Sequence, residues 1–478
     1  MERKTSMSLV WSSADKFGVQ LLAMLVGVFT ARMLSSADFG IIACLAIFTA
    51  IANVLIDSGF SAALIRREKN TNSEYCAAFL FNLIFSVLLY FVLYFSSGKI
   101  AQYYNIPQLV SLSRFVFIAV VINSLGIIQN IIFTREMKFK EISIANLVSA
   151  VVSAVVTVIL VLSGYTFWAI AWQQITLVAV RVAVMWALSN WKPIYKPDFS
   201  VLIKLFSFSA LLLLTSIVNI FGKNIYALKI PVKFGTTNFG YYDRARKFQE
   251  IPAGVVAGAL SSVAYPVLSS LNNEPDKQKQ FFRKMVRINA FLIFPVMLGL
   301  IGIIENMTVI VLTEKWLPMI DYFRILCATA IFMPFQSLCL TTFNAIGKAK
   351  YNFALELGRN LLIITLFFLF SENVTQMLLG YTTAMFCAYI CDIIFVGKFI
   401  KYSLSEHLRD ILPYAVISAA MCILVLIIGN FFARWHINIY LIFAAQCLLG
   451  AGFYIGTARL LGSQVIRDVF DLFRKKNG

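Results

Sequence analysis

Long apolar runs follow one another along the whole chain, and they constrain its fold more than any other feature. A transmembrane helix needs roughly 20 predominantly apolar residues, and about 14 runs of that length can be found. Hydrophobic residues make up 60% of the 478 positions and charged residues only 13%, whereas a soluble domain is roughly a quarter charged. The sequence therefore predicts an all-α polytopic membrane protein.

The connections between the runs are short, so no soluble domain of ordinary size fits between them. This argues against a membrane enzyme with a separate catalytic head. About 12 or 13 spans is the alternative count, because the runs at 250–270 and 355–370 are broken or short. The predicted spans are 8–32, 40–64, 77–96, 114–134, 145–164, 168–189, 205–228, 250–270, 287–312, 324–345, 355–370, 376–397, 411–433 and 437–458.

Basic residues are unevenly distributed over these connections. If the N-terminus lies in the cytoplasm, the inner connections and tails carry 26 Lys and Arg residues and the outer connections carry 11. This bias predicts an even number of spans with both termini in the cytoplasm. The first run lacks a small-residue cleavage site, so it is predicted to be a retained helix and not a signal peptide.

One predicted outer connection, 229–249, departs from the bias because it holds five of the 11 outer cations. Either the predicted topology is wrong there or the segment has a function. Part of it could be a helix that dips into the membrane or lines a cavity.

The cations of this segment are spaced for anion binding. Arg244 and Lys247 lie three positions apart, as residues on one helix face do. Arginine binds phosphate through a bidentate fork and lysine binds it as a point charge. Tyr242 could stack on a sugar ring or lie in the headgroup belt. An interfacial amphipathic helix with its cations among lipid headgroups is the alternative.

A short motif recurs after 200 residues. Ser36-Ala37-Asp38-Phe39-Gly40 corresponds to Thr236-Thr237-Asn238-Phe239-Gly240, and each motif follows a predicted span. Six predicted spans separate the two, so the halves would have the same orientation. Repeats of this kind commonly face each other across a central cavity and rock to give alternating access. The predicted organisation is a six-helix lobe over 1–200, a second over 201–400, and two further helices with a basic tail over 401–478.

Ionisable residues inside spans are functional candidates, since each costs roughly 2.5–3.5 kcal/mol at the bilayer centre. Lys16 could face a cavity, pair with the adjacent aspartate, or extend to the inner headgroups. Lys223 lies in a polar stretch of the seventh span, which favours a cavity-lining role. Asp57 could pair with Lys16 or Arg66, lie near the interface, or carry a coupling proton or sodium ion.

Catalytic and cofactor-binding motifs are absent from the sequence. It has no Gly-x-x-x-x-Gly-Lys loop and no paired carboxylates or hydrolytic triad. The eight cysteines lie mostly in apolar runs and the two histidines near span ends, so no metal site is expected. No basic stripe on a soluble module indicates a nucleic-acid partner. The chain is predicted to be neither an enzyme nor a cofactor-binding protein.

Several signatures nevertheless resemble one family. The sequence is similar to the bacterial polysaccharide flippases, the O-antigen, colanic-acid and capsule repeat-unit transporters of the multidrug/oligosaccharidyl-lipid/polysaccharide superfamily. The likeness extends over nearly the whole chain. The matching residues are Ala31-Arg32 with Leu34, Asp38–Gly40, Asp57–Phe60 followed by Ala63–Arg66, Asn238–Tyr242 with Arg244-Ala245 and Pro252, and Lys315–Pro318.

The resemblance implies transport of undecaprenyl-diphosphate-linked oligosaccharide from the inner to the outer leaflet of a bacterial cytoplasmic membrane. It implies a central cavity in which cations hold the diphosphate, and Lys16, Arg32, Lys223 and Arg244 are the candidates, with Lys247 and Tyr242 nearby. The expected partners are the lipid-linked cargo, the bilayer, and a polysaccharide polymerase with chain-length machinery. A monomer is expected.

Two rival functions remain at this stage. A drug/cation antiporter of the same superfamily would depend on Asp57 and other carboxylates and would take cationic cargo. An integral-membrane polymerase or ligase would need a large outer loop with catalytic residues. The longest outer connection predicted here is 229–249, which makes that function the least favoured.

Overall fold

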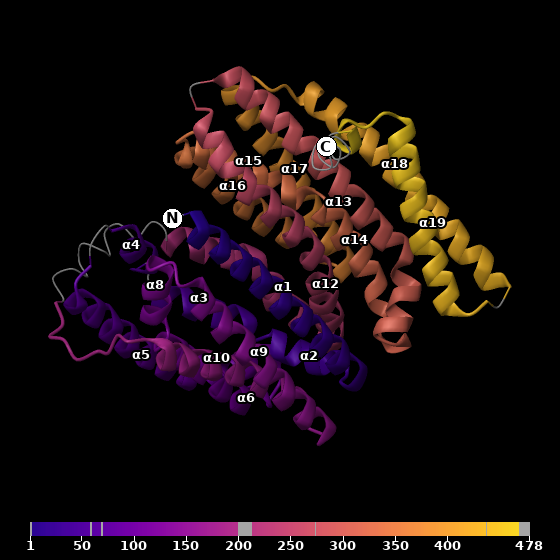
Figure 1. Cartoon of the computed structure of the whole chain (residues 1–478). Coiled ribbons are helices and arrows are strands. Elements are labelled where there is room, and N and C mark those ends of the chain that lie inside the picture. The colour runs from indigo at the N-terminus through magenta and orange to yellow at the C-terminus, as the bar shows by residue number, and fades with distance from the viewer. Residues whose placement is uncertain are drawn as a thin grey trace. The chain divides into compact units, whose positions relative to one another are not determined.

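A computed structural model describes residues 2–57, 60–67, 70–198, 213–272, 274–435 and 437–467, with side chains from residue 18 onward except at 60, 62 and 66. Every regular element in these ranges is a helix (Figure 1). The predicted all-α class is therefore confirmed.

The helices up to residue 198 include several short ones. They are α1 (Glu2–Met33), α2 (Ser36–Ala43), α3 (Ala46–Asp57), α4 (Phe60–Arg66), α5 (Asn72–Tyr104), α6 (Leu109–Val116), α7 (Ile118–Ser124), α8 (Ile127–Arg135), α9 (Phe139–Leu162) and α10 (Phe167–Leu188).

The later helices begin with a helical segment at 213–224. They continue with α12 (Tyr226–Ser270), α13 (Pro275–Val311), the 3₁₀ helix η1 (Glu314–Met319), α14 (Ile320–Ala330), α15 (Phe332–Ala345), α16 (Ala349–Leu369), α17 (Val374–Ile400), α18 (Leu404–Arg434) and α19 (Ile439–Leu460).

Twelve helical runs in the described ranges are long and apolar enough to cross a bilayer, and α1 adds the shorter apolar stretch Gly18–Met33. One of the twelve, 213–270, has 58 residues. At 1.5 Å per residue it would measure about 87 Å, whereas a hydrocarbon core is about 30 Å thick. This run therefore has enough length for two spans, and the predicted total of about 14 stays a prediction.

The prediction that residues 229–249 form an outer loop is wrong, because these residues are helical within α12. The only non-helical dihedral angles inside α12 are at Gly235, with φ 85° and ψ 163°. Such a φ favours glycine. Two of its five cations contact carboxylates one turn away, Lys247 with Asp243 at 2.7 Å and Arg246 with Glu250 at 3.3 Å, and such pairs support a charged helix.

Three predicted spans, 40–64, 114–134 and 324–345, are built from consecutive short helices and not from one. At the break after α2, the Leu45 N–H bonds to the Ile42 carbonyl at 3.0 Å. At the break after α6, the Val120 N–H bonds to the Phe117 carbonyl at 3.0 Å. These tighter turns satisfy backbone groups that hydrocarbon cannot.

The chain divides into two compact units, residues 1–240 and 241–478. In the second unit, α13, α18 and α19 approach closely around Val425. A Cβ added at Gly302 or Gly450 would lie 2.9 or 2.8 Å from a methyl group of Val425. Small residues at helix contacts are the usual means of bringing helices together in a membrane.

In the first unit, the repeated motifs contact each other reciprocally. A Cβ added at Gly40 would lie 2.0 Å from the Thr236 carbonyl oxygen, and one added at Gly240 would lie 1.8 Å from the Ser36 carbonyl oxygen. Ser36 begins α2, and Thr236 follows the break at Gly235. The glycine of each motif therefore lies against the backbone of the other, and the predicted repeat stays a prediction.

Gly40→Ala is expected to destabilise the protein by about 1–3 kcal/mol, the usual effect of overpacking, because a backbone oxygen cannot move aside as a side chain can. The matched control is Gly98→Ala in α5, where nothing lies within 4 Å of the added Cβ. Alanine favours a helix by about 1 kcal/mol over glycine, so the control should keep or gain stability. Melting temperatures of the purified proteins test this, and equal values for the two variants would contradict the close contact.

Candidate functional site

Two of the predicted cations of the first unit, Arg32 and Lys223, lie in the last turns of their helical segments. Arg32 is in the last turn of α1 and is exposed. Lys223 is in the helical segment 213–224 and is also exposed. The backbone of Lys16 belongs to α1, but its side chain lies outside the described residues.

Asp57, the last residue of α3, is half-buried. The Ser61 hydroxyl, in α4, donates a hydrogen bond to its carboxylate Oδ1. The two partners suggested by the sequence, Lys16 and Arg66, have side chains outside the described residues. The hydroxyl is a neutral partner and brings no positive charge to the carboxylate.

The predicted cluster of α12 is largely buried. Tyr242, Asp243 and Arg244 are only 4%, 7% and 9% exposed. Lys247 is exposed over 55% of its side chain while its ammonium contacts the Asp243 carboxylate. The structure thus brings the predicted residues Tyr242, Arg244 and Lys247 together on one helix, where Asp243 accompanies them.

The neighbouring residue Tyr241 joins two of the sequence signatures. Its hydroxyl donates to the Lys315 carbonyl at 3.2 Å. Its ring meets the Trp316 ring edge to face, with centroids 5.8 Å apart. Trp316 is completely buried, so the signature Lys315–Pro318 anchors the beginning of the charged part of α12.

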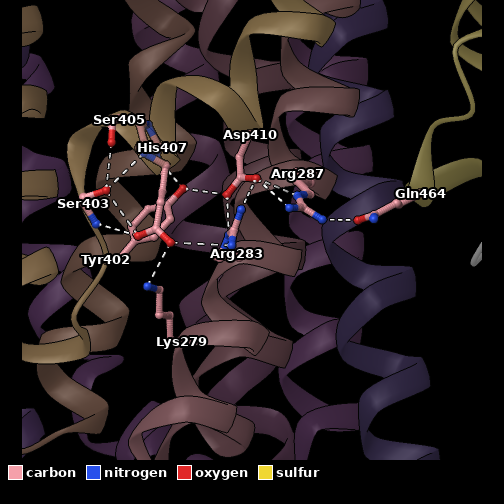
Figure 2. A network of polar contacts seen from close by, with 10 residues as sticks. Lys279, Arg283, Arg287, Tyr402, Ser403, Ser405, His407, Asp410 and Gln464 are labelled. Atoms are coloured by element: carbon pink, nitrogen blue, oxygen red, sulfur yellow. Dashed lines mark hydrogen bonds and ion pairs between the residues drawn. The ribbon is translucent and has the colours of Figure 1, made fainter.

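Sequence reasoning missed a network at the N-terminal ends of α13 and α18 (Figure 2). Its centre is Asp410, whose side chain is 2% exposed. Arg283 donates to both carboxylate oxygens, from Nε at 2.8 Å and from Nη2 at 2.9 Å. Arg287 donates from Nε at 2.8 Å, and Tyr402 donates its hydroxyl at 3.0 Å. Two guanidinium forks therefore hold one carboxylate.

The network extends in two directions from this centre. Glu406, one turn before Asp410, binds the Lys279 ammonium at 2.9 Å. In the other direction, Arg287 donates from Nη1 to the Gln464 side chain, beyond α19. The end of α19 is thereby connected to α13.

A buried histidine completes the network. His407 is 1% exposed and forms hydrogen bonds with the hydroxyls of Tyr389 and Tyr402. Its ring packs edge to face on Phe335, with centroids 5.8 Å apart. The surrounding aromatic rings explain why this histidine is structural here.

The sequence does contain a signal for this network. Arg283 and Arg287 are four residues apart, as are Glu406 and Asp410, and that spacing places each pair on one helix face. The signal is hidden when 271–287 is taken as a loop, whereas α13 already begins at Pro275.

A polar pocket of about 530 Å³ lies in the first unit between α5, α8 and the segment after α10. Arg135 donates to the Tyr75 hydroxyl at 2.5 Å and to the Arg67 carbonyl at 3.1 Å. Lys138 contacts Glu136 at 2.6 Å, and this hydrogen bond raises the pKa of the lysine amine. Two cations of the pocket, Arg135 and Lys138, are thus engaged by neighbouring groups.

Comparison with solved structures gives the class of the fold. The lipid II flippase MurJ, in an inward closed conformation, superimposes with a TM-score of 0.74 over 96% of this chain and 100% of that chain, at 16% identity. An inward-facing multidrug resistance MATE family transporter of the MOP superfamily gives 0.62 over 83% of this chain and 99% of that chain, at 14% identity. The fold is therefore that of the transporters of this superfamily.

Residues 29–321, more than half of the chain, match the family described as "Polysaccharide biosynthesis protein". The chain belongs to this family, which confirms the resemblance found in the sequence signatures. Teichuronic acid biosynthesis protein TuaB of Bacillus subtilis is 26% identical over 422 residues, 87% of this chain and 86% of that protein. Succinoglycan biosynthesis transport protein ExoT of Rhizobium meliloti is 22% identical over 306 residues, 64% of this chain and 62% of that protein.

Asp410→Asn is expected to destabilise the protein by about 3 kcal/mol, the lower end of the range for breaking a buried ion pair. The reason is that Arg283 and Arg287 lose their shared counter-charge while remaining only 27% and 26% exposed.

Glu406→Gln is the matched control, because Glu406 is 30% exposed and glutamine still completes the capping box of α18. Its expected effect is below about 1 kcal/mol. Thermal unfolding of both variants in detergent measures the difference, and similar losses in the two would contradict the central role of Asp410.

Proposed function

We propose that this protein flips undecaprenyl-diphosphate-linked oligosaccharide repeat units from the inner to the outer leaflet of a bacterial cytoplasmic membrane. The observation that carries the proposal is the match to the polysaccharide biosynthesis family together with a flippase fold over nearly the whole chain. A relative named as a succinoglycan transport protein supports it. The repeat units that this protein translocates would serve the synthesis of a surface polysaccharide.

The physical demands of such a cargo fit the chain. A lipid-linked sugar has a tail that is soluble in the membrane and a head that is not, so the head needs a polar, positively biased path. In the proposed site that bias comes from Lys16, Arg32, Lys223 and Arg244. Translocation breaks no covalent bond, so it requires no catalytic group.

We assign diphosphate binding to Lys16, Arg32, Lys223 and Arg244, with Lys247 and Tyr242 contacting the diphosphate or the first sugar. In α12, Lys247 contacts Asp243 at 2.7 Å, and its side chain is 55% exposed, so an incoming phosphate oxygen can reach it. We propose that the phosphate joins this contact and does not displace the carboxylate, because Asp243 is only 9% exposed and would be costly to leave without its cation.

The proposed mechanism is alternating access between two six-helix lobes, 1–200 and 201–400, around a central cavity. The segment 401–478 adds two helices, both termini lie in the cytoplasm, and the protein acts as a monomer beside a polysaccharide polymerase. Asp57 is the proposed coupling carboxylate, because it is half-buried and its described partner, the Ser61 hydroxyl, is neutral.

The drug/cation antiporter is the weaker alternative. The matched family and the relatives named above are described by their roles in polysaccharide biosynthesis. The TM-score with the MATE transporter, 0.62, is lower than the 0.74 with the lipid II flippase.

Lys223→Ala and Arg244→Ala are each expected to slow flipping at low cargo concentration by about 10-fold or more. A hydrogen bond to a charged group contributes about 1.5–3 kcal/mol, and 1.4 kcal/mol corresponds to tenfold. Purified protein in proteoliposomes would receive the undecaprenyl-diphosphate oligosaccharide, and a membrane-impermeant lectin would report its exposure.

Lys99→Ala, at an exposed lysine of α5, is the matched control and should flip normally. Flipping that survives in both site variants would refute the site and leave the function standing. Absence of flipping by the unmodified protein, with pH-driven efflux of organic cations instead, would favour the antiporter.

The proposed topology makes a separate prediction. In a variant lacking the exposed Cys387 and Cys391, a cysteine replacing Ser163 should react with an impermeant maleimide in intact spheroplasts. A cysteine replacing Lys277, whose side chain is 67% exposed, should react only after permeabilisation. The reverse pattern would place the termini outside.

A further inference from the structure

One carboxyl group of the second unit is buried without a hydrogen-bond partner for one of its oxygens. Asp392, on α17, is only 3% exposed. Its Oδ2 atom is shielded from solvent and has no hydrogen-bond partner in the described part of the chain. α17 is long and apolar enough to cross a bilayer, and Asp392 lies eight residues, about 12 Å, before its end at Ile400. A charge within a membrane span is costly and is a functional candidate by default.

The charged residues that act on Asp392 lie on α16, which packs against α17 (Figure 1). Arg359 and Glu356 both interact electrostatically with the Asp392 carboxyl group. They also contact each other, with Arg359 Nη2 at 3.4 Å from Glu356 Oε1. Their side chains are only 14% and 21% exposed. Three ionisable groups therefore share one largely buried region.

One guanidinium group cannot balance two carboxylates. If Glu356 and Asp392 were both ionised, two negative charges would face the single positive charge of Arg359, which leaves a net charge of −1. An unbalanced buried charge is unfavourable, and one proton removes it. Glu356 already contacts the cation and is the more exposed of the two, so the proton belongs on Asp392. A neutral carboxyl group also suits an oxygen that receives no hydrogen bond.

The titratable groups that α15 and α18 bring towards this part of α17 are a thiol and a bound imidazole. On α15, the Cys339 thiol interacts with Asp392 and is completely buried. On α18, His407 forms a hydrogen bond with the hydroxyl of Tyr389, which lies three residues before Asp392 on α17. Neither group supplies a positive charge to the carboxyl group as long as the imidazole is neutral.

The other two helices that pack against α17 have their nearest described polar groups engaged. On α13, Arg283 and Arg287 bind Asp410. α14 meets α17 nearer its beginning, where the hydroxyls of Thr329 and Thr382 are 2.6 Å apart. Among the described residues, the guanidinium group on α16 is thus the cation that acts on the buried carboxyl group.

We propose that Asp392 is a proton-binding site of the second unit, and that Arg359 exchanges between Glu356 and Asp392 as this proton leaves and returns. When the proton passes to water, its O–H bond breaks and the electron pair stays on the carboxylate oxygen. Arg359 then bonds from α16 to α17, whereas with the proton bound it bonds within α16. The proton would thereby control one link between two helices.

The proton-binding site does not depend on flipping. Its use as a second coupling site beside Asp57 would rest on the proposed function, since both helices belong to the proposed lobe 201–400. A test of proton binding alone therefore separates the two proposals.

Infrared spectra of the purified full-length protein in detergent provide this test, because a neutral carboxyl group has a C=O stretching band that a carboxylate lacks. Exposed aspartates are ionised at about pH 7. We expect a neutral-carboxyl band at that pH, and Asp392→Asn should remove it. Asparagine has nearly the size and polarity of a neutral aspartic acid, so this variant should fold. Asp321→Asn, at a side chain that is 79% exposed, is the control and should keep the band.

Glu356→Gln tests the exchange of the arginine. It releases Arg359 for Asp392, so the pH at which the band disappears should fall by about 1–3 units, the usual effect of an adjacent arginine on an aspartate. The matched control is Glu305→Gln, which also removes a glutamate bound to an arginine, Arg324 at 2.7 Å, and should cause no shift.

Four outcomes would overturn the proposal. They are the lack of a neutral-carboxyl band at about pH 7, a band that Asp392→Asn keeps, an unchanged titration in Glu356→Gln, and an equal shift in Glu305→Gln. Loss of the band on addition of sodium chloride but not potassium chloride would also overturn it, because the site would then bind sodium. None of these measurements involves cargo, so a failure here leaves the proposed flipping untouched.

Discussion

Every backbone N–H and C=O group in hydrocarbon needs a partner within the protein, because no water is present to supply one. That constraint explains why all regular elements in the described ranges are helices. It also explains how the helices are interrupted. The breaks near Leu45 and Val120 are tight turns that keep hydrogen bonds to carbonyls three residues earlier, so the chain changes direction without leaving polar groups unsatisfied.

The same constraint governs the charged side chains. In α12, Lys247 and Arg246 each contact a carboxylate four residues away, which lets a charged helix continue where a loop was expected. At the ends of α13 and α18, Asp410 serves two arginines at once. A polar network with most of its groups engaged fixes the relative placement of helices more firmly than apolar contacts alone.

The all-helical class, most of the apolar spans and the family could be predicted from the sequence, because hydropathy and the signature segments are local features. The helix at 229–249 could not, because summed hydropathy counts its five cations and ignores that Arg246 and Lys247 pair with carboxylates one turn away. The Asp410 network was missed for a related reason. Its partners Arg283 and Asp410 lie 127 residues apart, and only the fold brings them together. The orientations of the Lys223 and Arg244 side chains could not be predicted from one sequence either.

The contact between the two glycine motifs has the form of an isologous interface, in which residue 36 meets residue 240 and residue 236 meets residue 40. Interfaces of that form ordinarily join two identical subunits. Within one chain, the arrangement is what a gene duplication and fusion would leave behind if the ancestral half-length protein had paired with a second copy of itself. Because each motif's glycine makes room for the other's carbonyl oxygen, a change in either motif is limited by the other.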